Sequence, residues 1–294
     1  MQLRGSSRAK GFALIITADL LWGTVFVASQ VGLKYMSPYD LVFLRFLVAS
    51  FAILPIWVVF NARLSLSSAI KSKWTWFFAL VYSIGFIFQY VGQDLTTASE
   101  ATLLTNLSPI IVPIFAFLLL REPISNLQKA SFLIGLLGLF FIASPRFGLS
   151  QLQLAGDLIL FLTSVSYALF TVMSKKKRLE SLSGIFAVIL CTSLLLAFPA
   201  IFFGDGPQRV SGIGPAGWLA IVYLGIPCTL IAITLYLKGL DKVKASEAAI
   251  FFLLQVQVGL ILSAFLFGEY LSAVQIIGVI AVFIALFLGI ARAR

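Results

Sequence analysis

Apolar runs of about 20 residues follow one another along this chain from end to end, and this feature restricts its fold more than any other. A helix needs about 20 mostly apolar residues to cross a bilayer, because it rises about 1.5 Å per residue through a hydrocarbon core about 30 Å thick. The sequence therefore predicts an all-α membrane protein with ten transmembrane helices joined by short connections. The runs lie near residues 11–33, 39–60, 74–94, 99–119, 126–144, 155–174, 183–203, 216–237, 246–267 and 272–291.

The composition excludes several classes of function. Only 11% of the 294 residues are charged, against roughly 25% in soluble domains. The net charge of +10 does not predict a nucleic-acid partner, because the apolar runs leave no soluble domain to carry a basic face. The chain has no histidine, and Cys191 and Cys228 lie within apolar runs, so we expect buried thiols, no metal site and no cofactor. With no evident nucleophile or metal constellation and no Walker-type loop, neither an enzyme nor an ATP-driven pump is predicted.

The distribution of basic residues predicts the orientation of the chain. If the amino terminus is cytoplasmic, Lys34, Arg146 and Arg209 lie outside, Arg45 lies within the second run, and the remaining 17 of the 21 Lys and Arg residues lie inside. Such an excess in short cytoplasmic loops fixes orientation during insertion. The first run is longer than the roughly 7–15 residues of a signal-peptide core, so we expect it to be retained as a helix. Both termini are therefore predicted to be cytoplasmic, in a multi-pass protein of the cell inner membrane whose partner is the lipid bilayer.

The chain also contains an internal repeat. A shift of 147 residues lays ASEATLLTNLSPI (98–110) over ASEAAIFFLLQVQ (245–257), and Gly92 over Gly239, while a shift of 145 pairs Gly11 with Gly156 and Trp22 with Tyr167. These matches predict a tandem duplication of residues 1–148 and 149–294. Because each copy has five spans, the second copy enters the membrane from the opposite side, which gives two inverted five-helix repeats around a central cavity. Many secondary transporters have this architecture, whereas a passive scaffold has little use for it.

A set of motifs along the chain forms a recognisable pattern: Leu21-Trp22-Gly23, Pro38, Arg45, Ala98-Ser99-Glu100-Ala101, Pro109, Glu122 and Gln128. At these residues the chain resembles the drug/metabolite transporter superfamily, in its ten-helix EamA-type branch. This resemblance implies a ten-helix basket that moves amino acids, other metabolites or drugs, often outward. The second copy departs from the pattern, because Val256 stands where a proline is expected and Leu190 is the counterpart of Arg45. We interpret such asymmetries as candidate positions for substrate binding.

Two charged residues within the spans are the first candidates for binding substrate, because charges in the hydrocarbon are costly and mark function by default. Asp19 lies roughly 12 Å into the first run by helix rise and shares a helical face with Trp22. We expect Asp19 to contact a cationic group of the substrate or to take up a proton, with a hydrogen bond for packing as the alternative. Arg45 lies roughly 9 Å from the outer end of its run, where it would bind a substrate carboxylate or extend to the interface.

Polar residues in the spans complete the candidate site, and for each of them hydrogen bonding between helices is the alternative. Asn106 is the most informative, since it precedes Pro109, and backbone groups freed by a proline are tolerated where they line a cavity. The full set of candidate substrate-binding residues is Asp19, Trp22, Arg45, Gln89, Tyr90, Asn106, Tyr167, Gln255 and Gln257.

Several residues near helix ends have structural interpretations. Ser99-Glu100 and Ser246-Glu247 are expected to cap helix starts. Glu122 and its counterpart Glu269 are expected to brace loops or to gate the two halves. Small residues such as Gly135, Gly138 and Gly278 permit close helix packing or form the face of a homodimer.

Taken together, these patterns predict a secondary transporter of small metabolites, amino acids or similar solutes, working by alternating access and mainly in export. The solute gradient or protons would drive it. One alternative is a sugar-phosphate or nucleotide-sugar exchanger, but phosphate recognition needs several basic residues in the cavity, and Arg45 is the single candidate. The other is a membrane scaffold that transports nothing.

Overall fold

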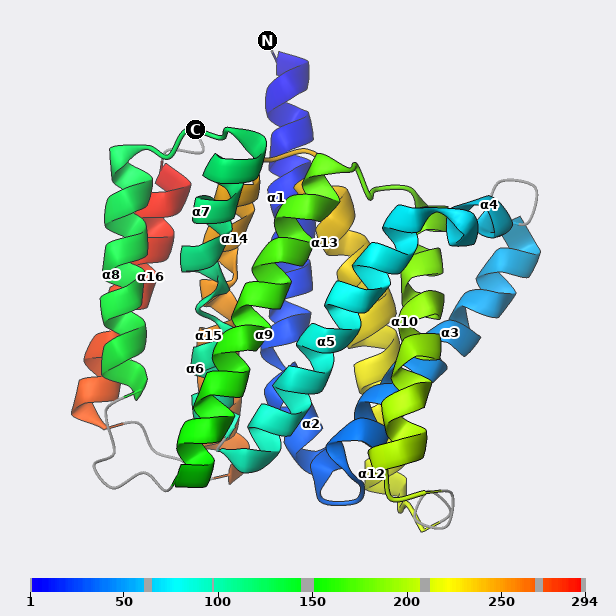
Figure 1. The fold of residues 1–294 in the computed structure, drawn as a ribbon. Helices are drawn as coiled ribbons and strands as arrows, with labels where there is room; N and C mark the ends of the chain where they lie inside the picture. The colour runs from blue at the N-terminus through cyan, green and yellow to red at the C-terminus, as the bar shows by residue number, and fades with distance from the viewer. Residues whose placement is uncertain are drawn as a thin grey trace.

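The computed structural model describes residues 2–60, 65–96, 98–143, 151–206, 212–267 and 272–291, and within these ranges every regular element is a helix (Figure 1). The first half contains α1 (Gln2–Gly23), α2 (Val25–Leu33), α3 (Pro38–Phe60), α4 (Leu66–Lys71), α5 (Lys73–Leu95), α6 (Ala98–Thr105), α7 (Ser108–Leu120) and α8 (Asn126–Ala143). The second half contains α9 (Gln151–Lys176), α10 (Leu182–Phe203), α12 (Pro215–Gly225), the π-helix η2 (Ile226–Ile231), α13 (Ala232–Leu240), α14 (Ala245–Phe251), α15 (Leu253–Phe267) and α16 (Ala273–Ala291).

These helices form the ten predicted spans, so the predicted all-α membrane fold is confirmed. Among the described residues, seven helical runs are long and apolar enough to cross a membrane, and shorter apolar stretches lie at Ile111–Leu120 in α7 and Ile276–Ala285 in α16. Four of the ten spans are each built from two or three elements that follow one another across a break: α1–α2, α6–α7, α12–η2–α13 and α14–α15. The short helix α4 between the second and third spans was not predicted.

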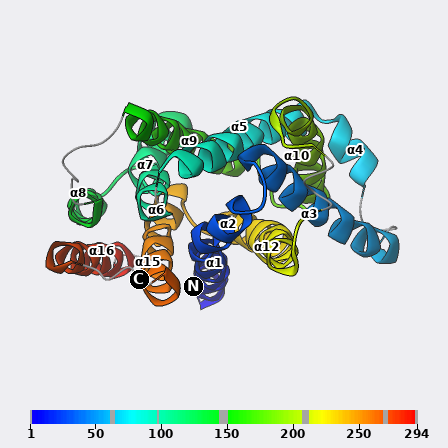
Figure 2. The ribbon, with the colours of Figure 1, turned by 90° about the horizontal axis from the view of Figure 1, so that it is seen from below.

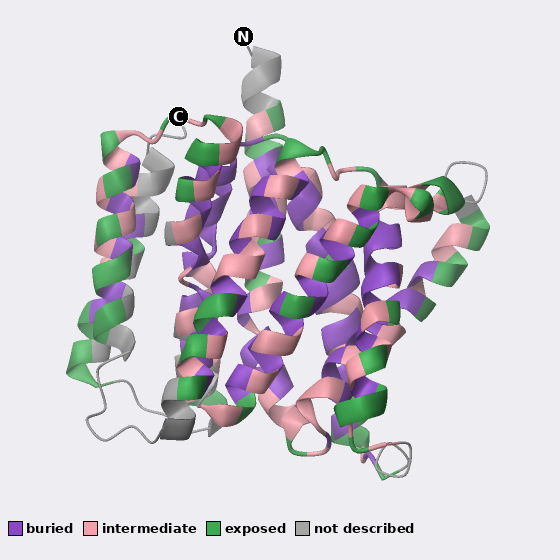
Figure 3. Cartoon of the chain, viewed as in Figure 1, coloured by how far each residue is buried: buried purple, intermediate pink, exposed green. Residues whose placement is uncertain are grey.

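The outer surface of the helices suits lipid. Large apolar side chains stand well exposed on it, such as Val59 at 75%, Ile201 at 76% and Phe265 at 89%. Soluble monomers rarely expose apolar patches of this extent. Buried residues concentrate in the middle of the bundle (Figure 3), so the polar groups that matter for function lie there.

The two halves run in opposite senses through the molecule. In Figure 1, α1 begins at the face where both termini are marked, whereas α9 begins at the opposite face. Each later helix of the second half is likewise reversed with respect to its counterpart in the first. The prediction of two inverted five-helix repeats is therefore confirmed, and both termini lie on one face, which we call the terminal face.

Two close helix crossings join the halves, and the repeat relates one to the other. In the first, α1 packs on α13, and a Cβ atom added to Gly239 would lie 2.7 Å from the carbonyl oxygen of Gly11. In the second, α9 packs on α5, and a Cβ atom added to Gly92 would lie 3.1 Å from the carbonyl oxygen of Gly156. Since the repeat pairs Gly11 with Gly156 and Gly92 with Gly239, the same contact occurs twice. Glycine is needed at these positions because the backbones approach closely.

At the end of the bundle that carries α8 and α16, these two helices lie side by side (Figure 2). The hydroxyl group of Ser131 donates to the carbonyl oxygen of Ala285 at 2.6 Å, and Gly135 faces Ala285 and Leu253. The small residues of α8 therefore serve packing within the chain. A homodimer stays a prediction.

The helix breaks lie in the middle of the bundle, where side chains bond the freed carbonyl groups. Thr24 separates α1 from α2, and its hydroxyl donates to the carbonyl oxygen of Leu21 at 2.7 Å. Between α6 and α7, the carbonyl oxygens of Leu104 and Thr105 both accept from the Ser164 hydroxyl. Non-helical backbone is tolerated at membrane depth where such partners, or a cavity, satisfy it. The break predicted near Pro109 is present, while the breaks at Thr24, η2 and Phe252 were not predicted.

Candidate functional site

A cavity lies between the two halves at these breaks, and both halves contribute to its wall. Six of the predicted binding residues line it: Trp22, Arg45, Gln89, Asn106, Tyr167 and Gln255. The other lining residues are Val25, Phe26, Tyr82, Phe86, Thr105, Ser108, Phe170, Thr171, Ile233, Tyr236 and Phe252.

Fourteen of the 17 described lining residues form seven pairs that the internal repeat relates, whereas Arg45, Tyr82 and Asn106 have counterparts that do not line the cavity. The cavity therefore lies where the two inverted halves meet. The pairs are Trp22 with Tyr167, Val25 with Phe170 and Phe26 with Thr171 at a spacing of 145 residues, and Phe86 with Ile233, Gln89 with Tyr236, Thr105 with Phe252 and Ser108 with Gln255 at a spacing of 147.

Arg45 breaks this symmetry, because its counterpart is Leu190, which does not line the cavity. The Arg45 side chain is only 1% exposed, so of the two predicted placements it takes the inward one and does not extend to the interface. Its guanidinium carbon lies 4.7 Å from the centre of the Phe86 ring, within the range of a cation–π interaction. The asymmetric positive charge therefore lies in the cavity wall.

Three hydrogen bonds hold the Arg45 guanidinium in place. Nε donates to Thr229 Oγ1 at 2.5 Å, Nη1 to the Tyr90 hydroxyl at 2.9 Å and Nη2 to the Cys228 carbonyl oxygen at 3.1 Å. The irregular turn of η2 exposes that carbonyl group, which also accepts from Trp22 Nε1 at 2.9 Å. A guanidinium has five N–H groups, so one hydrogen on each terminal nitrogen remains for a ligand.

No carboxylate of the described chain lies within ion-pair distance of Arg45. A buried cation without an anion is costly, and such groups normally pair or mark a binding site. The two remaining N–H groups suit the bidentate geometry in which arginine binds carboxylates. The cavity wall thus holds a buried cation that has no anion beside it among the described residues.

Asp19 lies outside the lining and reaches the cavity through Gln255. Asp19 is 0% exposed, and its Oδ1 accepts from Gln255 Nε2 at 2.7 Å. The predicted shared face of Asp19 and Trp22 is present in α1, but Gln255, not Asp19, forms the cavity wall at this point.

Two further amides in the wall keep free hydrogen-bonding capacity. Gln89 Oε1 accepts from the Tyr167 hydroxyl at 2.5 Å, which leaves the Nε2 group of Gln89 as a donor. Asn106 Nδ2 donates to the Thr102 carbonyl oxygen at 2.7 Å, which leaves Oδ1 as an acceptor. The cavity therefore offers a polar ligand both donors and acceptors.

The last two predicted residues lie outside the lining. Tyr90 stands behind Arg45 and accepts its hydrogen bond. Gln257 is 2% exposed, and its side-chain amide has no hydrogen-bond partner among the described residues. The sequence pattern does not separate Gln257 from Gln255, which is only two residues away, because both are polar residues in the same apolar run.

Aromatic side chains form most of the apolar wall, and sequence reasoning found only Trp22 and Tyr167 among those that the structure describes. Trp22, Tyr236 and Phe252 pack together at one side, with ring centres 5.1–6.3 Å apart. Tyr82 stacks on Phe170 at 4.3 Å, and Phe86 and Tyr167 complete the other side. The repeat alignment held a signal that could have found Tyr236, since it pairs this residue with the predicted Gln89.

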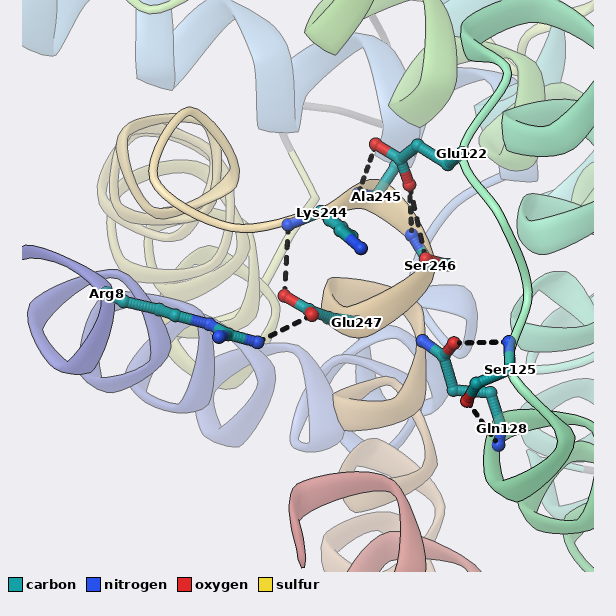
Figure 4. A network of polar contacts seen from close by, with 8 residues as sticks. All are labelled: Arg8, Glu122, Ser125, Gln128, Lys244, Ala245, Ser246 and Glu247. Carbon is teal, nitrogen blue, oxygen red and sulfur yellow. Dashed lines mark hydrogen bonds and ion pairs between the residues drawn. The ribbon is translucent and has the colours of Figure 1, made fainter. Parts of the chain in front are cut away.

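At the terminal face, a carboxylate from the first half bonds the start of a helix in the second half (Figure 4). Glu122 accepts from the backbone N–H groups of Ala245 and Ser246, at 3.2 and 3.3 Å, and from the Ser246 hydroxyl at 3.2 Å. Nearby, Glu247 accepts from Arg8 at 2.6 Å and from the Lys244 backbone N–H at 3.2 Å. A carboxylate at a helix amino terminus is favourable, since it satisfies free N–H groups.

These contacts correct one detail of the expected caps. Glu247 caps α14 as expected, but Ser246 donates to Glu122 and does not cap its own helix. Glu269 and the side chains of Ser99 and Glu100 lie outside the described residues. The Glu122 contact therefore joins the segment that follows α7 in the first half to the start of α14 in the second half at the terminal face.

We expect Glu122→Gln to open the cavity toward the terminal face. The amide would turn an N–H group toward the N–H donors of α14, so at least one of the three hydrogen bonds is lost. The measurement is the rate at which a membrane-impermeant maleimide labels Ser108→Cys, in a background without Cys191 and Cys228, and we expect it to rise severalfold from this face. Gln128→Ala is the matched control, because the Gln128 side chain bonds Ser125 of its own half and no other residue of the described chain. An unchanged labelling rate would show that Glu122 does not close this end.

Comparison with known proteins agrees with this architecture. The sequence matches the EamA-like transporter family twice, over residues 9–144 and 154–290. An uncharacterized transporter of Archaeoglobus fulgidus is 26% identical over 253 residues, which cover 83% of this chain and 84% of the relative. A probable biotin transporter of Pseudomonas aeruginosa is 29% identical over 198 residues, which cover 65% of this chain and 68% of the relative. A crystal structure of another protein has the same fold, with a TM-score of 0.78, 20% sequence identity and 98% of both chains covered. The chain, a multi-pass membrane transporter, belongs to the EamA-like transporter family.

Proposed function

We propose that this transporter is a secondary carrier of small solutes that bear a carboxylate group, with amino acids and similar solutes as the main class and export as the main direction. Arg45 is the observation that supports this proposal most. It is a buried, firmly held cation in the cavity wall, two of its N–H groups have no partner, and no carboxylate of the described chain pairs with it. A carboxylate of the solute would supply the missing anion.

The rest of the wall supports a solute with an apolar part as well. Rings such as those of Trp22, Phe86 and Phe252 face the cavity, and aromatic walls bury apolar groups while a few polar groups set orientation. Polar atoms such as Asn106 Oδ1 would accept from an amino group of the solute. An amino acid combines a carboxylate, an amino group and an apolar part in one small molecule.

The composition of the cavity argues against the phosphate-bearing solutes of the alternative hypothesis. Arg45 is the single Lys or Arg among the described lining residues, and a phosphate dianion is normally held by several cationic or backbone donors. Biotin deserves inclusion among the candidates, because one relative is named a probable biotin transporter and biotin carries a carboxylate without an amino group.

The experiment that tests this proposal is a binding panel on the purified protein. Amino acids, biotin, simple amines and sugar phosphates are compared by the shift they produce in the melting temperature, followed by direct binding measurements. We expect carboxylate-bearing solutes to bind and amines without a carboxylate not to bind. If only amines or only sugar phosphates bind, the proposed solute class is wrong.

For the location, we propose the cell inner membrane with both termini in the cytoplasm. The terminal face carries Arg8, Lys175, Lys242 and Lys244, and an excess of basic residues on one face is typical of the cytoplasmic side. A fluorescent-protein fusion at the carboxyl terminus is expected to fluoresce, and an alkaline phosphatase fusion at the same point is expected to be inactive. Phosphatase activity would reverse the assigned orientation.

A further inference from the structure

We propose that Asp19 makes the cavity selective for solutes with an amino group, because it fixes which end of the Gln255 amide faces the cavity. Asp19 would be a positioning residue that does not touch the solute, and Gln255 would be the residue that does. The inference rests on the proposed function, since it assumes that the solute binds in this cavity with its carboxylate at Arg45.

The orientation of the Gln255 amide follows from its contact with Asp19. Nε2 donates to Asp19 Oδ1 at 2.7 Å, and an ionised carboxylate can only accept. The amide must therefore direct its N–H end toward Asp19. Gln255 lines the cavity, and its Oε1 atom accepts no hydrogen bond within the described chain. An acceptor is thus presented to the solute, and an amino or ammonium group is the donor that matches it.

The charge around Asp19 points to the same ligand group. Asp19 is fully buried, its Oδ2 atom has no hydrogen-bond partner, and no Lys or Arg of the described residues lies within ion-pair distance. A carboxylate buried in this way is costly and needs a reason to be there. An ammonium group at Gln255 Oε1 would bring a positive charge next to the Asp19–Gln255 pair and reduce this cost.

The neighbours of Asp19 contribute no competing cation. From α13, the titratable side chain that interacts with Asp19 is Tyr236, which is bonded to Thr171. From η2, the Cys228 thiol donates to the carbonyl oxygen of Leu21. Lys242 packs on Gly11, more than two turns away from Asp19 along α1. The positive charge that complements Asp19 would therefore come from the bound solute.

The cavity then has two polar ends with opposite preferences. Arg45 presents donors to an anionic group, and Gln255 presents an acceptor to a cationic group. Because Asp19 belongs to the first half and Gln255 to the second, the selectivity for the amino group depends on contact between the halves.

The test is a double-mutant cycle with a matched pair of ligands, an amino acid and the same molecule without its amino group. In Asp19→Leu, the acceptor that holds Gln255 Nε2 is removed and no polar group replaces it, so the Gln255 amide is no longer held with Oε1 toward the solute. The preference for the amino acid, measured as the ratio of the two dissociation constants, should fall roughly tenfold, because a hydrogen bond to a charged group is lost. Gln255→Met should have the same effect, and the double variant should show no further change, since Asp19 acts through Gln255.

Controls separate this inference from the proposed function. Thr17→Val, on the lipid-exposed side of α1, should leave the ratio unchanged, and binding of the ligand without an amino group reports that each variant is folded. If Asp19→Leu does not fold, Asp19→Ala removes the same carboxylate. An unchanged ratio in these variants, or effects of Asp19 and Gln255 that add, would overturn the inference. If the wild-type protein binds neither ligand, the proposed function fails instead.

Discussion

Arg45→Gln is expected to weaken the binding of a carboxylate solute by about 100-fold and to abolish its transport. Loss of one partner of a buried, hydrogen-bonded charge pair typically costs about 2–5 kcal/mol, and about 2.7 kcal/mol corresponds to 100-fold in affinity. Glutamine keeps a polar side chain near Thr229 and Tyr90, so the main change is the loss of the charge. The measurement is the dissociation constant of the best ligand of the panel, together with the melting temperature of the variant.

Arg45→Lys is the matched control. Lysine keeps the charge but loses the planar group that bonds Thr229, Tyr90 and Cys228 at once, so an intermediate loss of affinity is expected. Ligands without a carboxylate should be insensitive to both substitutions. If Arg45→Gln is folded and binds the carboxylate ligand as tightly as the wild type does, Arg45 is a structural residue and does not bind solute.

Larger side chains at Gly239 or Gly92 are expected to cause the greatest loss of folded protein. The first side-chain atom at Gly239 would already lie 2.7 Å from the Gly11 carbonyl oxygen and 2.8 Å from Ile15 Cγ1, and backbone cannot move aside as a flexible side chain can. Overpacking of this kind typically costs about 1–3 kcal/mol for a small addition. We therefore expect Gly239→Ala to melt at a lower temperature and Gly239→Leu to yield little folded protein.

The internal repeat extends this prediction to the equivalent glycine of the other half. Gly92 is the counterpart of Gly239, and a Cβ atom there would lie 2.6 Å from Leu160 Cγ. We therefore expect Gly92→Ala to melt at a lower temperature and Gly92→Leu to yield little folded protein. Gly214→Ala is the control, because a Cβ atom there would have its nearest neighbour at 3.9 Å. Size-exclusion chromatography of fluorescent fusions measures the folded fraction. Normal amounts of folded Gly239→Leu would contradict the crossing described for α1 and α13.

The fold could be predicted from the sequence because its determinants are periodic. Hydrocarbon thickness sets the length of each span, and the repeat sets the inversion of the halves. The breaks in the spans were harder to predict. The break near Pro109 had a local signal that led to its prediction. The break at Thr24 directly follows Gly23, the last residue of α1, whereas the break at Phe252 has no proline or glycine beside it. Pro227 did mark η2, but nothing in the sequence indicated that a π-helix would result.

The candidate site could be predicted in part for a related reason. Polar residues in apolar runs stand out, which is why Arg45, Gln89, Asn106 and Gln255 were found. Aromatic residues do not stand out, because a ring that faces lipid and a ring that faces a cavity look alike in the sequence; Phe86 lines the cavity and Phe265 is 89% exposed. The direction in which a side chain points from its helix was also not predicted, since Asp19 points to Gln255 and not to the cavity itself.

Counterflow in proteoliposomes tests the central claim, that this cavity carries carboxylate solutes from one face to the other. Vesicles containing the purified protein are loaded with an unlabelled ligand of the panel and diluted into a trace of the labelled compound, with equal pH on both sides. The account predicts transient accumulation of the label with the wild-type protein and none with Arg45→Gln. The account would be contradicted by a carboxylate ligand that binds the wild-type protein, loses its binding in Arg45→Gln, and yet shows no counterflow with the wild-type protein.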